Sequence, residues 1–365
     1  MLPVCEPTLD GNEERYVTDA VSSGWISSSG KYLDKFETEF AEFSGAKYAI
    51  SCSNGTTALH LAVMSLGIGL GDEVICPDFT IIATSNAIMY TGATPIFVDV
   101  DTRGNINPDF IEASITPNTK AIMVVHMYGV PADMDRILDI AEKHGLYVIE
   151  DAAQAHGATY KGRPVGTIGN VGAFSFYSNK IISCGEGGMV VTNSPGISMA
   201  AKALRNHAFG PQRFVHEAIG YNYRMTNLQA AIGLAQLEKA DSLILARKVV
   251  AGLYNEHLCG IDGIEIFLKG EPGSVCWMYG ILVDKDKFGL SKDELMQELA
   301  KKGIETRSFF HPLSLQPIYA RIFGGGVYHP NSNKLWREGL YLPTYGHMSV
   351  EDIIRVCNAI RELRK

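Results

Sequence analysis

Lys180 is the residue of the sequence with the clearest chemical potential, and it lies in a loop between two apolar stretches. The apolar run at 173–176 precedes it, and a Gly-Glu-Gly-Gly turn at 185–188 leads into the apolar residues 189–191. This pattern predicts a strand, a loop and a second strand. A loop lysine that becomes desolvated can lose its proton near neutral pH and form a Schiff base with an aldehyde. A solvated surface lysine is the ordinary alternative, and this stretch alone favours it.

Asp151 is a second residue that could do chemistry, because it closely follows the apolar run at 146–149. A carboxylate at the end of a buried strand needs a cationic or hydrogen-bonding partner. Asp151 is therefore a candidate counter-ion for a protonated ring nitrogen. A helix cap or a turn aspartate is the common alternative.

The turn Ser-Cys-Ser-Asn-Gly-Thr-Thr at 51–57 joins a predicted strand at 48–50 to a helical pattern at 58–64. Such a turn presents free N–H groups at a helix start, where the helix dipole favours an anion. It is thus a candidate phosphate site, although it is not a Walker A loop. A plain turn with capping residues is the alternative.

The elements around these residues alternate between apolar strands and helices. This alternation predicts an α/β fold with a mainly parallel sheet covered on both faces, and with ligands at the carboxyl ends of the strands. Further strands are predicted at 73–76, 95–100 and 121–125, and helices at 81–89, 108–114, 134–144, 198–206 and 228–253.

The last third of the chain predicts a smaller α+β unit. Strands are expected at 276–283 and 306–310, and helices at 292–301 and 350–364. We therefore expect a large α/β domain at 1–240 and a small α+β domain at 241–365.

Composition excludes several classes of function. Hydrophobic residues make up 46% and the net charge is -8, without a Lys/Arg run, so a packed core is expected and nucleic acid is a poor partner. Seven cysteines without a Cys-x-x-Cys pair predict neither a disulfide framework nor a metal site. The absence of a signal-peptide pattern and of a long apolar span predicts a cytoplasmic protein with no membrane contact.

A loop lysine, a strand-end aspartate and a phosphate-type turn are together the parts of a pyridoxal 5'-phosphate (PLP) site. The lysine would form the Schiff base, the aspartate would keep the pyridine nitrogen protonated, and the turn would hold the phosphate.

Further motifs stand in order along nearly the whole chain. They are Gly-Trp-Ile-Ser-Ser at 24–28, Asn-Gly-Thr at 54–56, Gly-Ala-Thr-Pro at 92–95, His-Met-Tyr-Gly at 126–129, Glu-Asp-Ala-Ala-Gln-Ala-His-Gly at 150–157, Phe-Ser-Phe at 174–176, Gly-Glu-Gly-Gly at 185–188, Tyr-Asn-Tyr-Arg-Met at 221–225 and His-Pro-Leu-Ser-Leu-Gln-Pro at 311–317. With these motifs the sequence resembles the DegT/DnrJ/EryC1/StrS family of PLP-dependent nucleotide-sugar aminotransferases. The resemblance implies the aspartate aminotransferase type of fold, known as fold type I.

The resemblance also implies a role for each matching residue. Lys180 matches the catalytic lysine, which also carries the proton between substrate and cofactor. Cofactor contacts are implied for Asp151 at the pyridine nitrogen, Gln154 near the ring, Gly55, Thr56 and Ser175 at the phosphate, and Asn222 at the phosphate of a neighbouring subunit. Sugar or nucleotide contacts are implied for Trp25, Tyr128, His156, Arg224 and His311. The role of Asn222 further implies a homodimer with shared active sites.

One position departs from the family pattern. Many relatives carry an aromatic residue that stacks on the cofactor ring at the position of Ile81. Two alternatives stay open here: the side chain of Ile81 packs on the ring face, or the nearby Phe79 takes part.

The reaction implied by the resemblance has two halves. L-glutamate first leaves its amino group on the cofactor, and a nucleotide-linked 4-keto-6-deoxy sugar then accepts it at C4. Relatives that dehydrate the sugar replace the lysine with histidine, so Lys180 favours transamination over a PLP-dependent dehydratase. A cofactor-binding protein without activity, in a structural or regulatory role, is the alternative from another class.

Within the family, the pattern is most similar to the members that form GDP-perosamine from GDP-4-keto-6-deoxy-D-mannose. The loop at 25–28, the stretch at 220–227 and the Leu-Gln-Pro segment at 315–317 carry this likeness. Enzymes that use dTDP- or UDP-linked sugars share nearly all of these motifs, so the nucleotide stays open.

Overall fold

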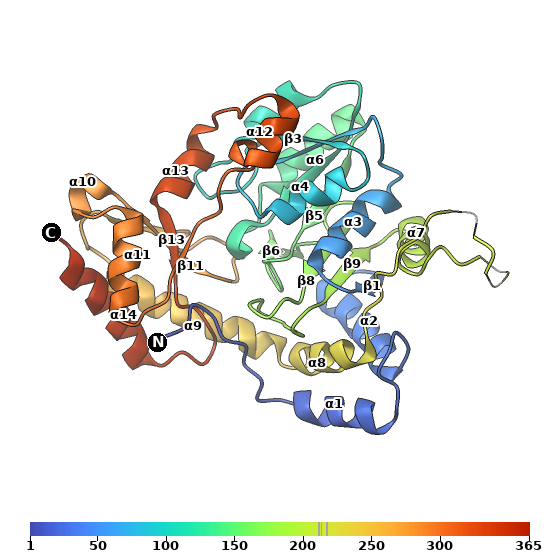
Figure 1. Ribbon diagram of the computed structural model, residues 1–365, viewed down its shortest axis with the longest axis horizontal. Coiled ribbons are helices and arrows are strands. Elements are labelled where there is room, and N and C mark those ends of the chain that lie inside the picture. Colours follow the sequence, from blue (N-terminus) through green and yellow to red (C-terminus); the bar gives the residue numbers. More distant parts are fainter. Residues whose placement is uncertain (211, 213, 217) are drawn as a thin grey trace.

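The chain folds into a part built on a large, mainly parallel sheet and a part built on a smaller antiparallel sheet (Figure 1). The computed structural model describes all residues from 1 to 365 except 211, 213 and 217. The large sheet formed by the described residues has seven strands in the order β1-β9-β8-β5-β4-β2-β3. They are β1 (Tyr48–Cys52), β2 (Glu73–Pro77), β3 (Thr94–Val98), β4 (Thr119–Val125), β5 (Tyr147–Asp151), β8 (Val171–Ser175) and β9 (Gly188–Thr192).

Neighbouring strands from β8 to β3 run parallel, which confirms the predicted mainly parallel sheet. Strand β9 is antiparallel to both β8 and β1, with Ser175 of β8 paired to Gly188 of β9. The loop between these two residues therefore leaves and returns at the carboxyl end of β8. Because β5 is parallel to β8, the end of β5 lies at the same edge, and Lys180 and Asp151 meet there.

Helices cover both faces of the large sheet, and alternate strand residues point to each face. The apolar clusters place α3 (Gly55–Ser65), α4 (Ile82–Met89) and α7 (Pro195–Arg205) on one face. They place α2 (Lys31–Ser44), α6 (Met134–His144) and α8 (Asn227–Leu237) on the other face. Helix α1 (Glu13–Ser22) packs outside on α8, and the short elements α5 (Pro108–Ile111), β6 (Thr159–Tyr160) and β7 (Arg163–Pro164) lie in connections.

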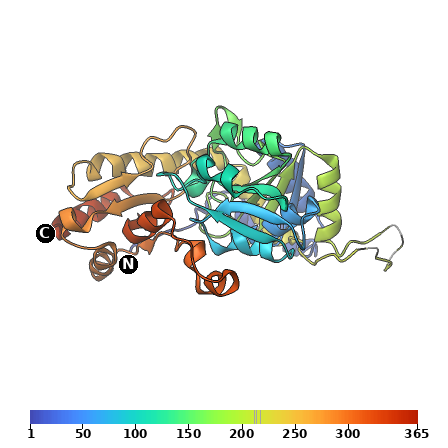
Figure 2. The same ribbon diagram turned by 90° about the horizontal axis from the view of Figure 1, so that it is seen from above.

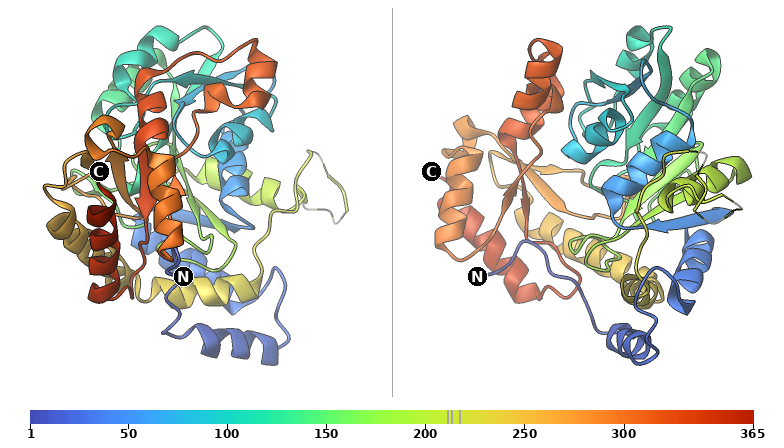
Figure 3. Two further views of the ribbon diagram at one scale, coloured as in Figure 1. Left: turned by 60° about the vertical axis from the view of Figure 1, so that its left-hand side comes forward. Right: turned by 45° about the vertical axis from the view of Figure 1, so that its right-hand side comes forward.

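The smaller sheet is antiparallel, in the order β10-β11-β13-β12, and lies beside the large-sheet part (Figure 3). A separate apolar cluster forms its core, and Leu2 from the start of the chain belongs to that cluster. Among the described residues, we find no helix with both the length and the apolar character needed to cross a membrane. The elements of this part are α9 (Ala240–Leu258), β10 (Ile264–Phe267), β11 (Tyr279–Val283), α10 (Lys285–Phe288), α11 (Lys292–Lys301), β12 (Arg307–Ser308), α12 (Pro317–Phe323), α13 (Pro330–Glu338), β13 (Gly339–Leu342) and α14 (Val350–Leu363).

Two buried carboxylates tie the second part to the strand ends of the first. Asp78, after β2, accepts hydrogen bonds from the amide of Ser314 at 2.6 Å and from its hydroxyl at 3.1 Å. Asp99, after β3, accepts from the amide and the hydroxyl of Ser332 at 3.0 and 2.8 Å, and from the amide of Asn331 at 3.0 Å. Asp99 thus caps α13 from a distant part of the chain.

Two predicted elements differ from the structure. The helix expected at 228–253 is divided into α8 and α9, because Lys239 leaves helical geometry at φ -118° and ψ 20°. The strand expected at 276–283 begins only at Tyr279, because Cys276 has a positive φ of 52°. The chain before β11 instead docks on the large-sheet part, where the amide of Trp277 donates to the carbonyl of Tyr128 at 3.2 Å. The division of the chain near residue 240 stays a proposal.

Candidate active site

Lys180 lies in the loop between β8 and β9, lines a cavity, and has an aromatic ring beside its amine. Its Nζ lies 3.9 Å from the ring centroid of Trp277. Burial lowers the pKa of Lys180 to about 8, and the Asp151 carboxylate opposes this shift. A lysine whose pKa lies near the pH of the cell can both give and accept a proton.

Asp151 ends β5 and is almost completely buried, with 2% exposure. Its two oxygens accept hydrogen bonds from the hydroxyl of Thr84 at 2.9 Å and from the amide of Ala153 at 3.2 Å. Burial raises the pKa of Asp151, and these two donors and the Lys180 amine act against the rise. The carboxylate is therefore held in a fixed orientation at the cavity floor, as a partner of a cationic nitrogen must be.

The start of α3 forms the predicted anion cradle. The side chain of Asn54 caps this helix by accepting from the amide of Thr57 at 2.9 Å, and the first backbone turn closes from Ala58 to Asn54. The earlier amides of Gly55 and Thr56 precede this bond and have no partner within the helix. A Cβ at Gly55 would lie 2.6 Å from Cβ of Ser175, so glycine alone leaves the cradle open.

These groups line one cavity of about 580 Å³. Gln154 also reaches it, and its Oε1 accepts from the amide of Tyr128 at 2.7 Å. The predicted residues that the structure brings together around this cavity are Gly55, Thr56, Asp151, Gln154, Ser175 and Lys180. An amine, a buried carboxylate and a backbone cradle in one hollow match the aldehyde, the ring nitrogen and the phosphate of PLP.

Two residues expected to contact sugar or nucleotide lie behind the cavity wall, which corrects that expectation. Tyr128 is 2% exposed and stacks with Phe310, with centroids 5.8 Å apart and planes at 8°. His156 is fully buried among the rings of Phe174 and Phe176 and of α2, and this burial lowers its pKa to about 3. Both side chains support the wall and do not reach the cavity.

The other expected substrate residues, Trp25, Arg224 and His311, are partly or largely exposed and do not line this cavity. Trp25 is 59% exposed at a separate hollow. Arg224 donates through Nε to Oδ1 of the exposed Asn222 at 2.9 Å. His311 meets the ring of Trp336 edge-on, with centroids 4.3 Å apart. Their contacts with a substrate or with a second subunit stay predictions.

The structure distinguishes between Ile81 and Phe79, the two residues considered for packing on the cofactor ring. Ile81 is 46% exposed and lines the cavity, whereas Phe79 is completely buried against Tyr128 and Phe309. Of the two alternatives, only Ile81 is in a position to face a cofactor ring.

Sequence reasoning missed one cavity wall and one residue of the floor. Trp277, Arg307, Phe310 and Tyr341 reach the cavity from the small-sheet part, and Thr84 supports Asp151 from below. Trp277, Arg307 and Phe310 all belong to predicted strands, but a strand pattern does not indicate that their side chains reach a cavity. The remaining wall residue, Tyr341, carried no recognisable spacing.

The fold and the site together define a fold type I PLP enzyme. The model of the DegT/DnrJ/EryC1/StrS aminotransferase family matches residues 7–361, and the chain belongs to this family. It is a PLP-dependent sugar aminotransferase.

Known relatives and a solved structure agree with this assignment. The chain is 44% identical to the GDP-perosamine synthase of Caulobacter vibrioides, over 99% of this chain and 98% of the relative. It is 42% identical to the GDP-perosamine synthase of Vibrio cholerae, with the same coverage. The crystal structure of S. venezuelae DesV superposes with a TM-score of 0.89 at 36% identity, over 96% of this chain and 94% of DesV.

Proposed function

We propose that the chain transfers the amino group of L-glutamate to C4 of GDP-4-keto-6-deoxy-D-mannose and so forms GDP-perosamine. The observation that carries the chemistry is the meeting of Lys180, Asp151 and the Gly55–Ser175 cradle in one cavity. The choice of sugar and nucleotide is supported by the two GDP-perosamine synthases, which the chain matches along almost their full length.

The residues of the chain divide the work of such a transfer. PLP, when bound, supplies an aldehyde that condenses with amines and a ring that accepts electrons. The amides of Gly55 and Thr56 and the hydroxyl of Ser175 would bind its phosphate, and Asp151 would keep a proton on its ring nitrogen. Lys180 would be the residue that holds the aldehyde, and its Nζ would give and accept the proton, for which its pKa of about 8 is suited.

Arg307 supports a dicarboxylate as amino donor. Arg307 lines the cavity from the small-sheet part, and its guanidinium lies 3.5 Å from the carboxylate of Glu305. Planar, paired N–H donors match a carboxylate better than an ammonium group does. We assign one carboxylate of L-glutamate to Arg307.

A homodimer with shared sites is supported by the segment that follows α7. The described residues of 206–222 leave the body of the chain (Figure 2) and carry the exposed Phe209, Val215 and Ile219, of which Ile219 is 82% exposed. Exposed apolar residues on a projecting segment are typical of an interface. Asn222, at the end of this segment, lies outside the cavity of its own chain and so suits the predicted phosphate contact in a second subunit.

Mixed dimers test this arrangement. Neither the Lys180→Ala nor the Asn222→Leu variant should turn over alone. A mixed dimer regains one intact site, because the native Lys180 and Asn222 come from different subunits, so mixing the two should restore part of the activity. Mixtures as inactive as the separate variants would contradict shared sites.

The substrate is tested with the purified enzyme, PLP and L-glutamate against GDP-, dTDP- and UDP-linked 4-keto-6-deoxy sugars. We expect an amino sugar from the GDP-linked substrate, identified by mass spectrometry. Preferred turnover of a dTDP- or UDP-linked sugar would replace the assigned nucleotide. A deoxygenated product without an amino group would instead assign a dehydratase.

A further inference from the structure

The indole of Trp277 lies against the amine of Lys180. The distance of 3.9 Å from Nζ to the ring centroid is well inside the range of about 6 Å for a cation–π contact. Trp277 is 3% exposed and comes from the small-sheet part, just before β11. Because an indole face attracts a cation but does not take its proton, this contact can hold the amine without consuming its acid–base function.

The indole is held from several sides. Its Nε1–H donates to the carbonyl of Asn179, the residue before Lys180, at 2.8 Å. Its ring stacks on Tyr128, with centroids 6.0 Å apart and planes at 21°. Its own carbonyl accepts from Arg247 Nη1 at 3.3 Å. The side chain that touches the amine therefore also fixes the main chain beside the lysine.

The segment that leads to Trp277 is anchored on the large-sheet part. The amide of Val275 donates to the carbonyl of Gly129 at 3.2 Å, and the amide of Thr159 donates to the carbonyl of Gly273 at 3.1 Å. A Cβ at Gly273 would overlap the carbonyl of Thr159, so this close approach requires glycine.

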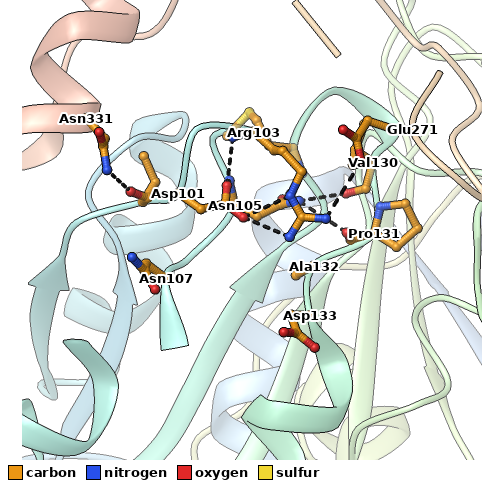
Figure 4. Close-up of polar contacts among 12 residues, drawn as sticks. Asp101, Arg103, Asn105, Asn107, Val130, Pro131, Ala132, Asp133, Glu271 and Asn331 are labelled. Atoms are coloured by element: carbon orange, nitrogen blue, oxygen red, sulfur yellow. Dashed lines mark hydrogen bonds and ion pairs between the residues drawn. The ribbon is translucent and has the colours of Figure 1, made fainter. Parts of the chain in front are cut away.

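A polar network adds a second anchor to the same segment (Figure 4). Arg103 donates to Asp101 through Nε at 2.9 Å and Nη2 at 2.8 Å, and its other terminal nitrogen lies 3.7 Å from Glu271. Asn105, on the same turn, donates to the carbonyls of residues 130 and 131 at 3.3 and 3.2 Å. The chain that leads up to the indole is thus fixed at residues 271, 273 and 275 before any ligand is considered.

Several titratable groups surround the Lys180 amine. They are Asp151 from β5, Cys5 from the start of the chain, His156 behind the loop, and Glu186 and Arg307 at the cavity. Asp151 favours the charged amine, but burial has the larger effect and lowers the pKa of Lys180. The indole contributes to that burial, because it covers the amine on one side.

We propose that Trp277 is a positioning residue for Lys180: its ring face holds the amine in the cavity, and its N–H fixes the preceding peptide group. The proposal rests on the proposed role of Lys180 as the proton carrier. Under this proposal the site depends on Trp277 of the small-sheet part, although its predicted cofactor contacts come from the large-sheet part.

The test compares Trp277→Phe, which keeps a ring face, with Trp277→Met, which fills space without one. Full-length chains freed of PLP are labelled with acetic anhydride over a pH series, and the labelling of Lys180 is compared with that of the exposed Lys120 by mass spectrometry. The wild type should show a midpoint near 8. Methionine fills the space but offers no ring face to the charged amine, so the midpoint in Trp277→Met should move below that of the wild type. A fall of about one in the pKa of Lys180 raises its labelling about tenfold at pH values well below both midpoints. Trp277→Phe should stay close to the wild type.

Equal midpoints in all three chains would overturn the proposal, as would the same change of midpoint in both variants. A second measurement needs no tryptophan variant and covers the case in which Trp277→Met does not fold. In nuclear magnetic resonance spectra, the indole N–H signal of Trp277 should titrate with the midpoint of Lys180 and lose this titration in Lys180→Met. An indole signal that ignores pH in the wild type would refute the contact.

Kinetics with bound PLP separate this proposal from the proposed function. Both Trp277 variants should lower kcat more than they change KM for glutamate, since the donor contact at Arg307 is left in place. A normal kcat in both variants would overturn the positioning role. If the wild type transfers no amino group at all, the proposed function fails, while the labelling and resonance measurements still decide the contact.

Discussion

Replacing Gly55 by alanine probes the phosphate cradle without touching Lys180 or Asp151. The new Cβ would lie 2.6 Å from Cβ and 2.9 Å from Oγ of Ser175. Carbon atoms prefer about 3.5–4.0 Å, so one of the two residues must shift. Alanine suits a helix start at least as well as glycine does. The strain therefore falls on the contact with Ser175, and we expect its hydroxyl to leave the cradle.

The magnitude follows from the loss of one hydrogen bond to a phosphate. Such a bond to a charged group contributes about 1.5–3 kcal/mol. A loss of about 2 kcal/mol corresponds to a dissociation constant for PLP about 30-fold higher than in the wild type. Overpacking should also cost the PLP-free chain about 1–3 kcal/mol of unfolding free energy. Absorbance titration with PLP measures the first quantity, and chemical unfolding measures the second.

Ser175 supplies the matched controls. Ser175→Ala removes the hydroxyl without adding an atom, so it should weaken PLP binding as much as Gly55→Ala but leave stability nearly unchanged. Ser175→Gly in the Gly55→Ala background makes room for the new methyl group, and should restore stability but not affinity. Gly55→Ala with the PLP affinity of the wild type would refute the cradle.

Three further outcomes are expected. Lys180→Ala should abolish turnover while unfolding remains cooperative, and undiminished turnover would exclude this lysine as the proton carrier. In the PLP-free chain, the difference in unfolding free energy between the wild type and Lys180→Met should rise with pH between about 8 and 10.5. The reason is that the Lys180 amine loses its proton more readily in the folded than in the unfolded chain. A free-energy difference that does not change with pH contradicts the lowered pKa of Lys180. Arg307→Gln should raise KM for glutamate about 10- to 150-fold without changing PLP affinity, the effect of one charged hydrogen bond, and an unchanged KM in steady-state assays would remove Arg307 from the donor site.

The large sheet could be predicted because each of its strands is a short apolar run between helical patterns. The break between α8 and α9 could not be predicted in the same way. Leu234, Leu237, Ala240 and Leu243 are all buried at helical spacing across it, so the hydrophobic period continues through the bend. The bend is set by contacts distant in sequence, since the amine of Lys239 pairs with carboxylates near the start of the chain.

The predicted part of the site follows from one topological rule, that parallel strands end at the same edge. This rule brings Asp151 and Ser175 together without any knowledge of side-chain direction. It gives no direction for side chains near a strand end. The substrate contacts of Tyr128 and His156 were implied by the family resemblance alone, and both side chains lie behind the cavity wall. The missed wall depends on docking between distant segments, and no local pattern around Trp277 reports that docking.

The origin of the residues suggests why the site needs both parts of the chain. The residues that we predict to bind the cofactor, the cradle residues and Asp151, all belong to the large-sheet part. Trp277 and Arg307 come from the other part, and we propose that they position the amine of Lys180 and bind the donor. Asp78 and Asp99 hold the two parts together through buried hydrogen bonds. Because these hydrogen bonds do not involve a ligand, the cavity between the two parts is formed before a substrate binds. The contact between the two parts should therefore affect turnover more than it affects the affinity for the cofactor.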